Sequence, residues 1–199
     1  MAKLSGEKPS KIGQSLILKE NLLYSGNWTE LIEFKYQDEE KTVRKWEGLN
    51  RKKKPPVVVI IAQLKPSNRY ILIRQFRPPT KSYILEFPAG LVDCGEDAKS
   101  AAKRELLEET GYSGEVEKQS PNLFSSPGII SEKFSFVFIS VDEKMYKNRI
   151  PISKGEPGEF ITVFLKYPEE IRGFFNDESK QGVLFDSKVY TYFMAKGIL

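Results

Sequence analysis

The feature that most constrains the fold is an apolar, largely β-branched run, VVVIIAQL, at Val57–Leu64. Its length suits a strand and falls far short of the roughly 18 residues that a membrane span needs. A strand that is apolar at nearly every position is buried on both faces. Pro55-Pro56 precede the run and mark a boundary in the chain. We therefore expect a sheet covered on both sides by helices, beginning after residue 54.

The remaining patterns supply further strands and the helices. Strand patterns follow at residues 70–76, 84–87, 134–141 and 160–165. Helical patterns occur at residues 97–110, 168–175 and 187–195. Ahead of the proline pair, short strand patterns occur at residues 16–18, 27–36 and 42–47, with a hairpin tip at 38–40. This order predicts an α+β protein: an α/β/α sandwich around a mixed sheet at residues 55–199, and a small antiparallel β unit at residues 1–54.

Two features of the composition restrict the chemistry. The 199 residues include no histidine, which excludes Ser-His-Asp and Cys-His catalysis and His-ligated zinc. A single cysteine, Cys94, excludes intramolecular disulfides and Cys-cluster metal sites. Acid–base work falls to Asp, Glu, Lys, Tyr or water. A metal site must use oxygen ligands, which favours Mg²⁺, Mn²⁺ or Ca²⁺.

The net charge of +4 arises within residues 1–54, which hold 12 Lys and Arg against 8 Asp and Glu. The densest run is Arg51–Lys54. A solvated turn between strands is the main interpretation, with a contribution to binding an anionic small molecule or nucleic acid as alternatives. Residues 1–10 lack the apolar core of a secretory signal, so a cytoplasmic protein is expected, with the nucleus as an alternative.

Three glutamates share one face of the predicted helix at residues 97–110. Glu105, Glu108 and Glu109 stand at positions i, i+3 and i+4, where like charges destabilise a helix by ~0.2–0.5 kcal/mol per pair. Either this is a solvated acidic face helped by Arg104 and Lys103, or it binds a divalent cation. Carboxylates are hard oxygen ligands, and Mg²⁺ held by a few of them keeps positions open for phosphate oxygens.

The segment GLVDCGEDAKSAAKRELLEETGY, from Gly90 to Tyr112, resembles the Nudix box, G-x5-E-x7-R-E-U-x-E-E-x-G-U, in which U is a bulky apolar residue. Eight positions match in register: Gly90, Glu96, Arg104, Glu105, Leu106, Glu108, Glu109 and Gly111. Tyr112 fills the last U position, where aliphatic residues are commoner. The resemblance implies the Nudix fold and a Nudix hydrolase.

Motifs outside the box resemble the ADP-ribose and ADP-sugar pyrophosphatase branch of that family. They are RQFRPP at 74–79, EFPAG at 86–90, SPG at 126–128, GNW at 26–28, WE at 46–47 and Arg51. The branch has a proline about 15 residues after the box, and Pro127 stands there. The resemblance implies Mg²⁺-dependent hydrolysis of the pyrophosphate bond of ADP-ribose or another ADP-sugar, with Mn²⁺ as an alternative ion.

Catalytic roles are likewise implied by the resemblance. The metal ligands would be Glu105, Glu109 and the carbonyl of Ala89, with Glu108 as a further candidate. Arg104 would orient a box glutamate through a charge-assisted hydrogen bond. The branch takes its general base from a downstream loop, where Glu159 is the first candidate and Glu156 its rival; the alternative is a box glutamate.

Substrate contacts are implied in the same way. Trp28 and Trp46 would stack on the adenine and Glu47 would bind its edge. Arg51 and Arg77 would bind the diphosphate, because a guanidinium forks onto phosphate oxygens; Leu91 would add a contact. Ser126 replaces an acidic residue of the relatives, which leaves the terminal-ribose contacts open. The branch forms homodimers with exchanged N-terminal strands, so the two tryptophans would come from different subunits.

Three other functions are open at this point. The same stacking site could serve oxidised nucleoside diphosphates such as 8-oxo-dGDP. A non-catalytic nucleotide sensor is a second alternative, although this chain keeps every box glutamate. Nucleic-acid binding through Arg51–Lys54 is a third, and the even charge balance after residue 54 argues against it.

Overall fold

The structure is a computed structural model that describes residues 13–153, 155, 158 and 160–199. It divides into two compact units. The first comprises the chain up to Lys54 together with Phe124–Glu132, and the second comprises Pro55–Leu123 and Lys133–Leu199. Segment 124–132, which lies inside the expected 55–199 domain, thus packs with the N-terminal unit.

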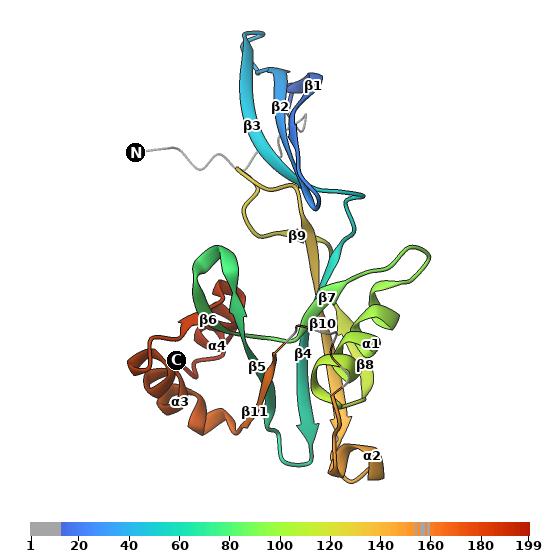
Figure 1. The fold of residues 1–199 in the computed structure, drawn as a ribbon, viewed down its shortest axis with the longest axis vertical. Helices are drawn as coiled ribbons and strands as arrows, with labels where there is room; N and C mark the ends of the chain where they lie inside the picture. Colours follow the sequence, from blue (N-terminus) through green and yellow to red (C-terminus); the bar gives the residue numbers. More distant parts are fainter. Residues whose placement is uncertain (1–12, 154, 156–157, 159) are drawn as a thin grey trace, which may run out of the picture. The chain divides into compact units, whose positions relative to one another are not determined.

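The first unit contains a three-stranded antiparallel sheet in the order β1-β2-β3 (Figure 1). Its strands are β1 (Leu16–Ser25), β2 (Thr29–Gln37) and β3 (Val43–Arg51). Between β2 and β3, the Asp38 carboxylate accepts hydrogen bonds from the backbone N–H groups of Glu40 and Thr42 at 3.0 and 2.9 Å. The predicted hairpin tip is therefore confirmed, because an Asp side chain closes the turn onto its own backbone.

The second unit is built on a mixed sheet of nine described strands, in the order β12-β6-β5-β4-β10-β8, with β11 on β5, β7 on β4 and β9 on β10. The strands are β4 (Val57–Lys65), β5 (Tyr70–Arg77), β6 (Ser82–Glu86), β7 (Ala89–Leu91), β8 (Glu115–Gln119), β9 (Leu123–Phe124), β10 (Lys133–Asp142), β11 (Thr162–Lys166) and β12 (Leu184–Phe185). β4 runs parallel to β10 and antiparallel to β5 and β7.

Helices lie on both sides of this sheet (Figure 1). They are α1 (Ala98–Thr110), α2 (Tyr146–Arg149), α3 (Ile171–Lys180) and α4 (Ser187–Ala195), with 3-10 turns at Pro78–Thr80 and Pro168–Glu170. Among the described residues, no helix is both long and apolar enough to cross a membrane.

Alternate residues of β4 enter two separate cores. Val58 and Ile60 pack in a cluster with Leu106 of α1, while Val59 packs in a second cluster with Phe193 of α4. Side chains of a strand alternate between its two faces, so each face of β4 is covered by its own helical layer. The expectations of a doubly buried strand and of an α+β fold with a mixed sheet are confirmed.

Candidate active site

Helix α1 has well-defined ends. At its start the Asp97 carboxylate accepts a hydrogen bond from the backbone N–H of Ser100 at 2.8 Å. At its end Gly111 adopts the left-handed conformation, with φ 75°, and its N–H donates to the Leu107 carbonyl at 2.9 Å. This is the cap geometry that glycine tolerates best. The predicted helix at 97–110 and its terminal glycine are confirmed.

The same helix presents its glutamates in different environments. Leu106 is fully buried against the sheet, and this fixes the rotation of the helix about its axis. Glu109 is only 6% exposed and the Glu105 side chain 15%, whereas the Glu108 side chain is 44% exposed. Two of the three carboxylates are therefore enclosed by protein, and the third faces outward.

The backbone of β7 lies directly against the two enclosed carboxylates. The N–H of Ala89 donates to Oε2 of Glu109 at 3.0 Å. A Cβ atom on Gly90 would overlap the carboxyl group of Glu105. Glycine is therefore required here for close approach, and the structure brings Ala89, Gly90, Glu105 and Glu109 together.

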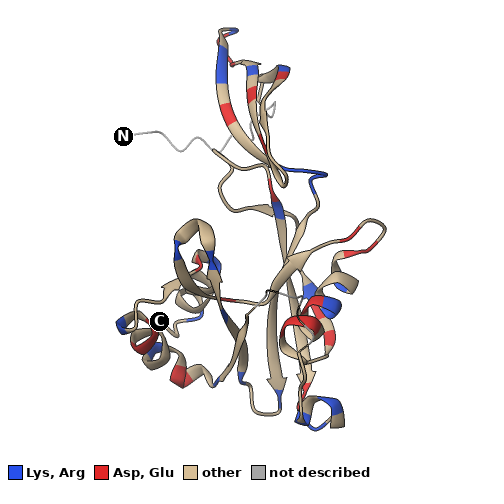
Figure 2. Cartoon of the chain, viewed as in Figure 1, with Lys and Arg blue, Asp and Glu red and all other residues tan. Residues whose placement is uncertain are grey.

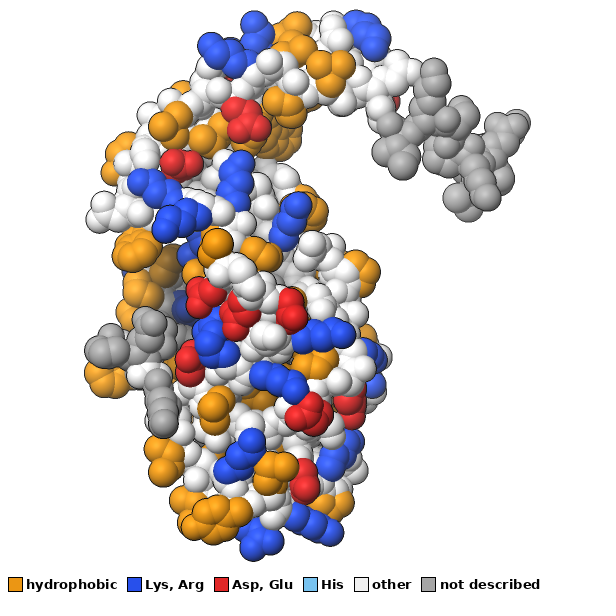
Figure 3. All heavy atoms as spheres, turned by 90° about the vertical axis from the view of Figure 1, so that its right-hand side faces the viewer, with side chains coloured by type: hydrophobic (Ala, Val, Ile, Leu, Met, Phe, Trp, Pro, Cys, Tyr) orange, Lys and Arg blue, Asp and Glu red, His pale blue; other side chains and the backbone are white. Residues whose placement is uncertain are grey.

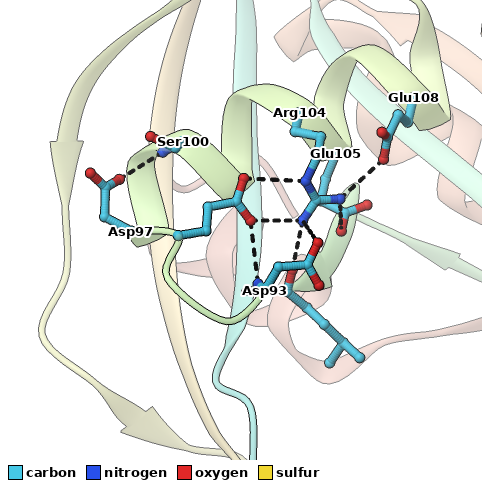
Figure 4. Close-up of polar contacts among 8 residues, drawn as sticks. Asp93, Asp97, Ser100, Arg104, Glu105 and Glu108 are labelled. Carbon is cyan, nitrogen blue, oxygen red and sulfur yellow. Dashed lines mark hydrogen bonds and ion pairs between the residues drawn. The ribbon is translucent and has the colours of Figure 1, made fainter.

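Arg104 donates hydrogen bonds to three glutamates of the segment and to one backbone carbonyl (Figure 4). Its Nη1 donates to Glu105 at 2.8 Å and to Glu108 at 3.1 Å. Its Nη2 donates to Glu96 and to the Leu91 carbonyl, both at 2.9 Å, and its Nε donates to Glu96 at 3.2 Å. One guanidinium thus ties the loop before the helix to two glutamates on the helix and offsets their mutual repulsion.

The charges of this network stabilise one another. The hydrogen bond from Arg104 is the main reason that the pKa of Glu96 lies below its ordinary value. In turn, the hydrogen bond to Glu96 is the main influence that raises the pKa of Arg104. Glu96 also accepts a hydrogen bond from the backbone N–H of Asp93 at 3.3 Å. Both groups therefore stay ionised across the physiological range, and the loop is fixed to the helix by charge.

The donors near β7 suit a hard divalent cation. Within the described ranges, no group of three or more His, Cys, Asp or Glu side chains is arranged to hold a metal ion. The carboxylates of Glu105 and Glu109 lie together, beside the backbone of Ala89 and Gly90. An ion that keeps several water or phosphate ligands needs only a few protein oxygens, so this set fits Mg²⁺ or Mn²⁺.

Both tryptophans belong to the first unit and neither lies in a core. Trp28, in the turn between β1 and β2, is 78% exposed, and Trp46 on β3 is 54% exposed. The indole N–H of Trp46 donates to the Gly128 carbonyl at 2.8 Å. A cavity of about 320 Å³ lies beside Trp46, between the sheet and segment 127–131; Phe34 is among its lining residues. Segment 124–132 thus fixes the ring of Trp46.

The other predicted substrate residues divide into one free position and two ion-paired arginines. Glu47 is exposed and lines a shallow hollow beside Trp46. Nε of Arg51 donates to Glu132 at 2.8 Å. Nε and Nη2 of Arg77 donate to the two oxygens of Glu86 at 2.9 and 3.1 Å. Both candidate diphosphate ligands are therefore already held by a carboxylate.

The two carboxylates that hold these arginines were given no role by sequence reasoning. Glu86 offered a signal, since it is a charged residue at the end of the apolar strand pattern YILEF. Glu132 offered none, because its partner Arg51 lies 81 residues away. Leu91, predicted to contact substrate, is 37% exposed and contributes its carbonyl to Arg104.

The two candidates for the general base, Glu156 and Glu159, lie outside the described residues. The described residues that precede them in the chain lie beside the C-terminal end of α1. There the backbone of Pro151 and Ile152 packs where a Cβ on Gly111 would stand. The beginning of this loop is thus placed against the helix that carries the glutamates.

Comparison with known proteins matches residues 53–187 to the NUDIX domain family. An ADP-ribose pyrophosphatase of Saccharomyces cerevisiae is 35% identical over 184 residues, covering 86% of this chain and 77% of that protein. An ADP-sugar pyrophosphatase of Mus musculus is 34% identical over 194 residues, covering 94% and 89%. A crystal structure of an ADP compounds hydrolase shares the fold, with a TM-score of 0.62 and 21% identity over 83% of this chain and 86% of that one.

Box residues Gly90, Glu105 and Glu109 lie together where β7 meets α1, and the family match spans most of the chain. This chain belongs to the NUDIX family.

Proposed function

We propose that the protein is an ADP-ribose diphosphatase, which hydrolyses the pyrophosphate bond of ADP-ribose, or of a related ADP-sugar, to AMP and a sugar phosphate such as ribose 5-phosphate. The observation that carries the proposal is the packing of the Glu105 and Glu109 carboxylates against the Ala89–Gly90 backbone, beside the Arg104 network. The names of the yeast and mouse relatives support the choice of substrate.

Nudix hydrolases generally need a divalent metal, and we assign Mg²⁺, with Mn²⁺ as the alternative. Bound there, the ion would neutralise charge on the diphosphate and help to activate a water molecule. Glu105, Glu109 and the Ala89 carbonyl would hold it, and the more exposed Glu108 would be a further ligand. Arg104 would orient Glu105 and Glu108 through its hydrogen bonds.

The base that takes a proton from water must be a carboxylate, because the chain has no histidine. We favour Glu159, with Glu156 as its rival and a box glutamate as the alternative. A base supplied by the loop after Ile152 would let the two tasks of holding charge and accepting a proton fall to different residues.

On the substrate side, we assign the adenine to Trp46 and Trp28, with Glu47 at its edge and Arg51, Arg77 and Leu91 as further contacts. Base stacking on an aromatic side chain contributes on the order of 1–3 kcal/mol in related settings. The exposure of both indole rings supports this assignment, because a ring buried in a core is not accessible to a base. We also propose a homodimer in which the two tryptophans come from different subunits, and a cytoplasmic location.

A turnover screen with Mg²⁺ tests the proposal. ADP-ribose, ADP-glucose, NADH, diadenosine compounds and 8-oxo-dGDP would be compared by kcat/KM, with products identified by mass. We expect ADP-ribose or another ADP-sugar to be preferred. Preference for 8-oxo-dGDP would replace the substrate assignment, and tight binding of ADP-ribose without turnover would indicate a sensor instead of an enzyme.

The variant Glu109→Gln tests the metal site. It should lower turnover by more than the roughly 10- to 100-fold that loss of a metal ligand's support costs. Glu178→Gln is a matched control, because Glu178 is equally buried, at 4% exposure, on α3. Near-normal turnover in Glu109→Gln would refute the metal assignment.

A further inference from the structure

Arg77 and Glu86 form a two-pronged ion pair between two neighbouring strands. Arg77 ends β5 and Glu86 ends β6, and these strands pair antiparallel. Nε of Arg77 donates to Oε1 of Glu86 at 2.9 Å, and Nη2 donates to Oε2 at 3.1 Å. Such parallel hydrogen bonds fix the plane of a guanidinium as well as its position.

The carboxylate of this pair is held rigidly within the fold. The Glu86 side chain is 10% exposed, whereas that of Arg77 is 43% exposed. β6 pairs with β5 on one side and with β12 on the other. Just beyond it, the backbone N–H of Asp186 donates to the Leu85 carbonyl at 3.0 Å. Glu86 is therefore a fixed support, and Arg77 is the partner that reaches toward solvent.

The buried position of the Glu86 carboxylate disfavours its ionised form. Burial raises the pKa of Glu86, and the hydrogen bonds and charge of Arg77 oppose that rise. Two other charged groups act on it from the start of α4, Asp186 raising and Lys188 lowering its pKa, and these two pair with each other at 2.6 Å. A buried, costly carboxylate whose main partner is an exposed arginine indicates a functional role.

In its contacts with the residues that the structure describes, Arg77 uses only part of its hydrogen-bonding capacity. A guanidinium has five N–H donors in a planar fork. Glu86 engages the edge formed by Nε and Nη2. The opposite edge, formed by Nη1 and the second hydrogen of Nη2, has the geometry that binds two phosphate oxygens at once.

We propose that Glu86 is a positioning residue, which orients Arg77 so that the second edge of its guanidinium is presented to the diphosphate of the substrate. This inference rests on the proposed function, in which Arg77 binds the diphosphate. It assigns no chemistry to Glu86 itself. Loss of Glu86 should therefore weaken substrate binding and leave the protonation steps unchanged.

The same strand offers a matched control. Arg74, three residues before Arg77 on β5, donates from Nη1 to both oxygens of Glu178 at 3.1 and 2.8 Å. Glu178 is 4% exposed, and the Arg74 guanidinium lies over the ring of Phe164 at 5.2 Å. Positions three apart on a strand point to opposite faces, so Arg74 and Arg77 lie on different sides of β5. Because Glu178 belongs to α3, the Arg74–Glu178 pair serves the packing of α3.

The test compares steady-state kinetics of Glu86→Gln and Glu178→Gln with ADP-ribose at saturating Mg²⁺. We expect Glu86→Gln to raise KM by about 10- to 100-fold, the range that misplacement of a binding group produces, with little change in kcat or in its pH profile. Glu178→Gln should leave KM unchanged. Arg77→Lys should raise KM similarly, and the double variant Arg77→Lys/Glu86→Gln should be no worse than Arg77→Lys alone, since the two residues act as one unit.

The outcomes distinguish failure of the positioning role of Glu86 from failure of the proposed diphosphatase function. A normal KM in Glu86→Gln, with Arg77→Lys impaired, would overturn the positioning role alone. A normal KM in Arg77→Lys would also overturn it, because Arg77 would then not contact the substrate. No turnover of any ADP-sugar by the unmodified protein would overturn the proposed function and this inference with it. If Glu86→Gln does not fold, Glu86→Asp keeps the charge but shortens the reach and should also raise KM.

Discussion

Side chains of this protein that could bind an anionic substrate are held in place by other side chains. Arg104, Arg51 and Arg77 each donate to at least one carboxylate. The sequence indicates which residue types carry the chemistry, but it does not show these pairings, which span 8 or 9 residues for Arg104 and Arg77 and 81 residues for Arg51. Trp46 belongs to the same pattern, because its indole N–H is bound by the Gly128 carbonyl.

Replacing Trp46 should therefore separate stacking from orientation. Trp46→Ala should raise the KM for ADP-ribose by about 5- to 150-fold with kcat little changed, because stacking is worth roughly 1–3 kcal/mol. Trp46→Phe keeps a ring but loses the hydrogen bond to Gly128, so its KM should lie between those of the wild-type protein and Trp46→Ala. Steady-state kinetics measures both values.

Tyr146→Ala serves as the control for loss of an exposed aromatic ring, since Tyr146 on α2 is 82% exposed. It should leave KM unaltered. A wild-type KM in Trp46→Ala would remove the stacking role from Trp46.

The elements that form the site differ in how well their sequence specifies them. β4 has a continuous apolar run and α1 and α4 have helical patterns, and the structure agrees with their prediction to within one residue at each end. β7 is only Ala89–Leu91, and alanine and glycine have little intrinsic tendency to form strands. It exists because it pairs with β4. Short elements of this kind, which also include β8, β9, β12 and α2, depend on partners that a local pattern does not reveal.

Other boundaries shifted for identifiable reasons. The predicted strand at 16–18 is the start of β1 (Leu16–Ser25), whose nearly complete exposure leaves no alternation to read. The predicted helix at 168–175 is a 3-10 turn followed by α3, which continues to Lys180. The box residues of the candidate site could be predicted, whereas the pairing of Arg77 with Glu86 could not.

The close approach of β7 to α1 makes Gly90 a test of how Glu105 is held in place. Gly90→Ala would place a methyl group where the Glu105 carboxyl group lies. The end of a glutamate side chain can move aside, so we expect the fold to persist while Glu105 is displaced. Turnover should fall by about 100-fold or more, in line with misplacement of a catalytic group. Thermal unfolding and kcat, measured on the same preparation, check both parts.

Gly173→Ala is the matched control for an added methyl group. Gly173 lies in α3, and nothing stands within 4 Å of the added Cβ. Alanine in a helix should be more stable than glycine by roughly 0.5–1 kcal/mol, with normal turnover. Equal activity in both variants would show that Gly90 is not required for the position of Glu105.

The whole molecule consists of two units, and both expose charged and apolar side chains. Across the chain, basic and acidic side chains are intermixed, and the loop after β3 is its most basic stretch (Figure 2). Apolar side chains are also exposed, among the charged ones (Figure 3). Those on β1 and the following turn include Leu22 at 58%, Leu23 at 48%, Tyr24 at 67% and Trp28 at 78% exposure.

From the exposed apolar side chains of β1 and the following turn, we expect the protein to be a homodimer through its N-terminal unit. Nearly all side chains of β1 are exposed, and among the described residues β1 is an edge strand of ten residues whose outer backbone groups pair with no further strand. Light scattering coupled to gel filtration should give twice the mass of the chain. Leu23→Glu should shift the protein to monomer and raise the KM for ADP-ribose, because the two tryptophans are proposed to act from different subunits. Met194→Glu, at an equally exposed apolar position on α4, should stay dimeric and active. A monomeric, fully active wild-type protein at micromolar concentration would rule out the shared site, since each chain would then bind adenine with its own residues alone.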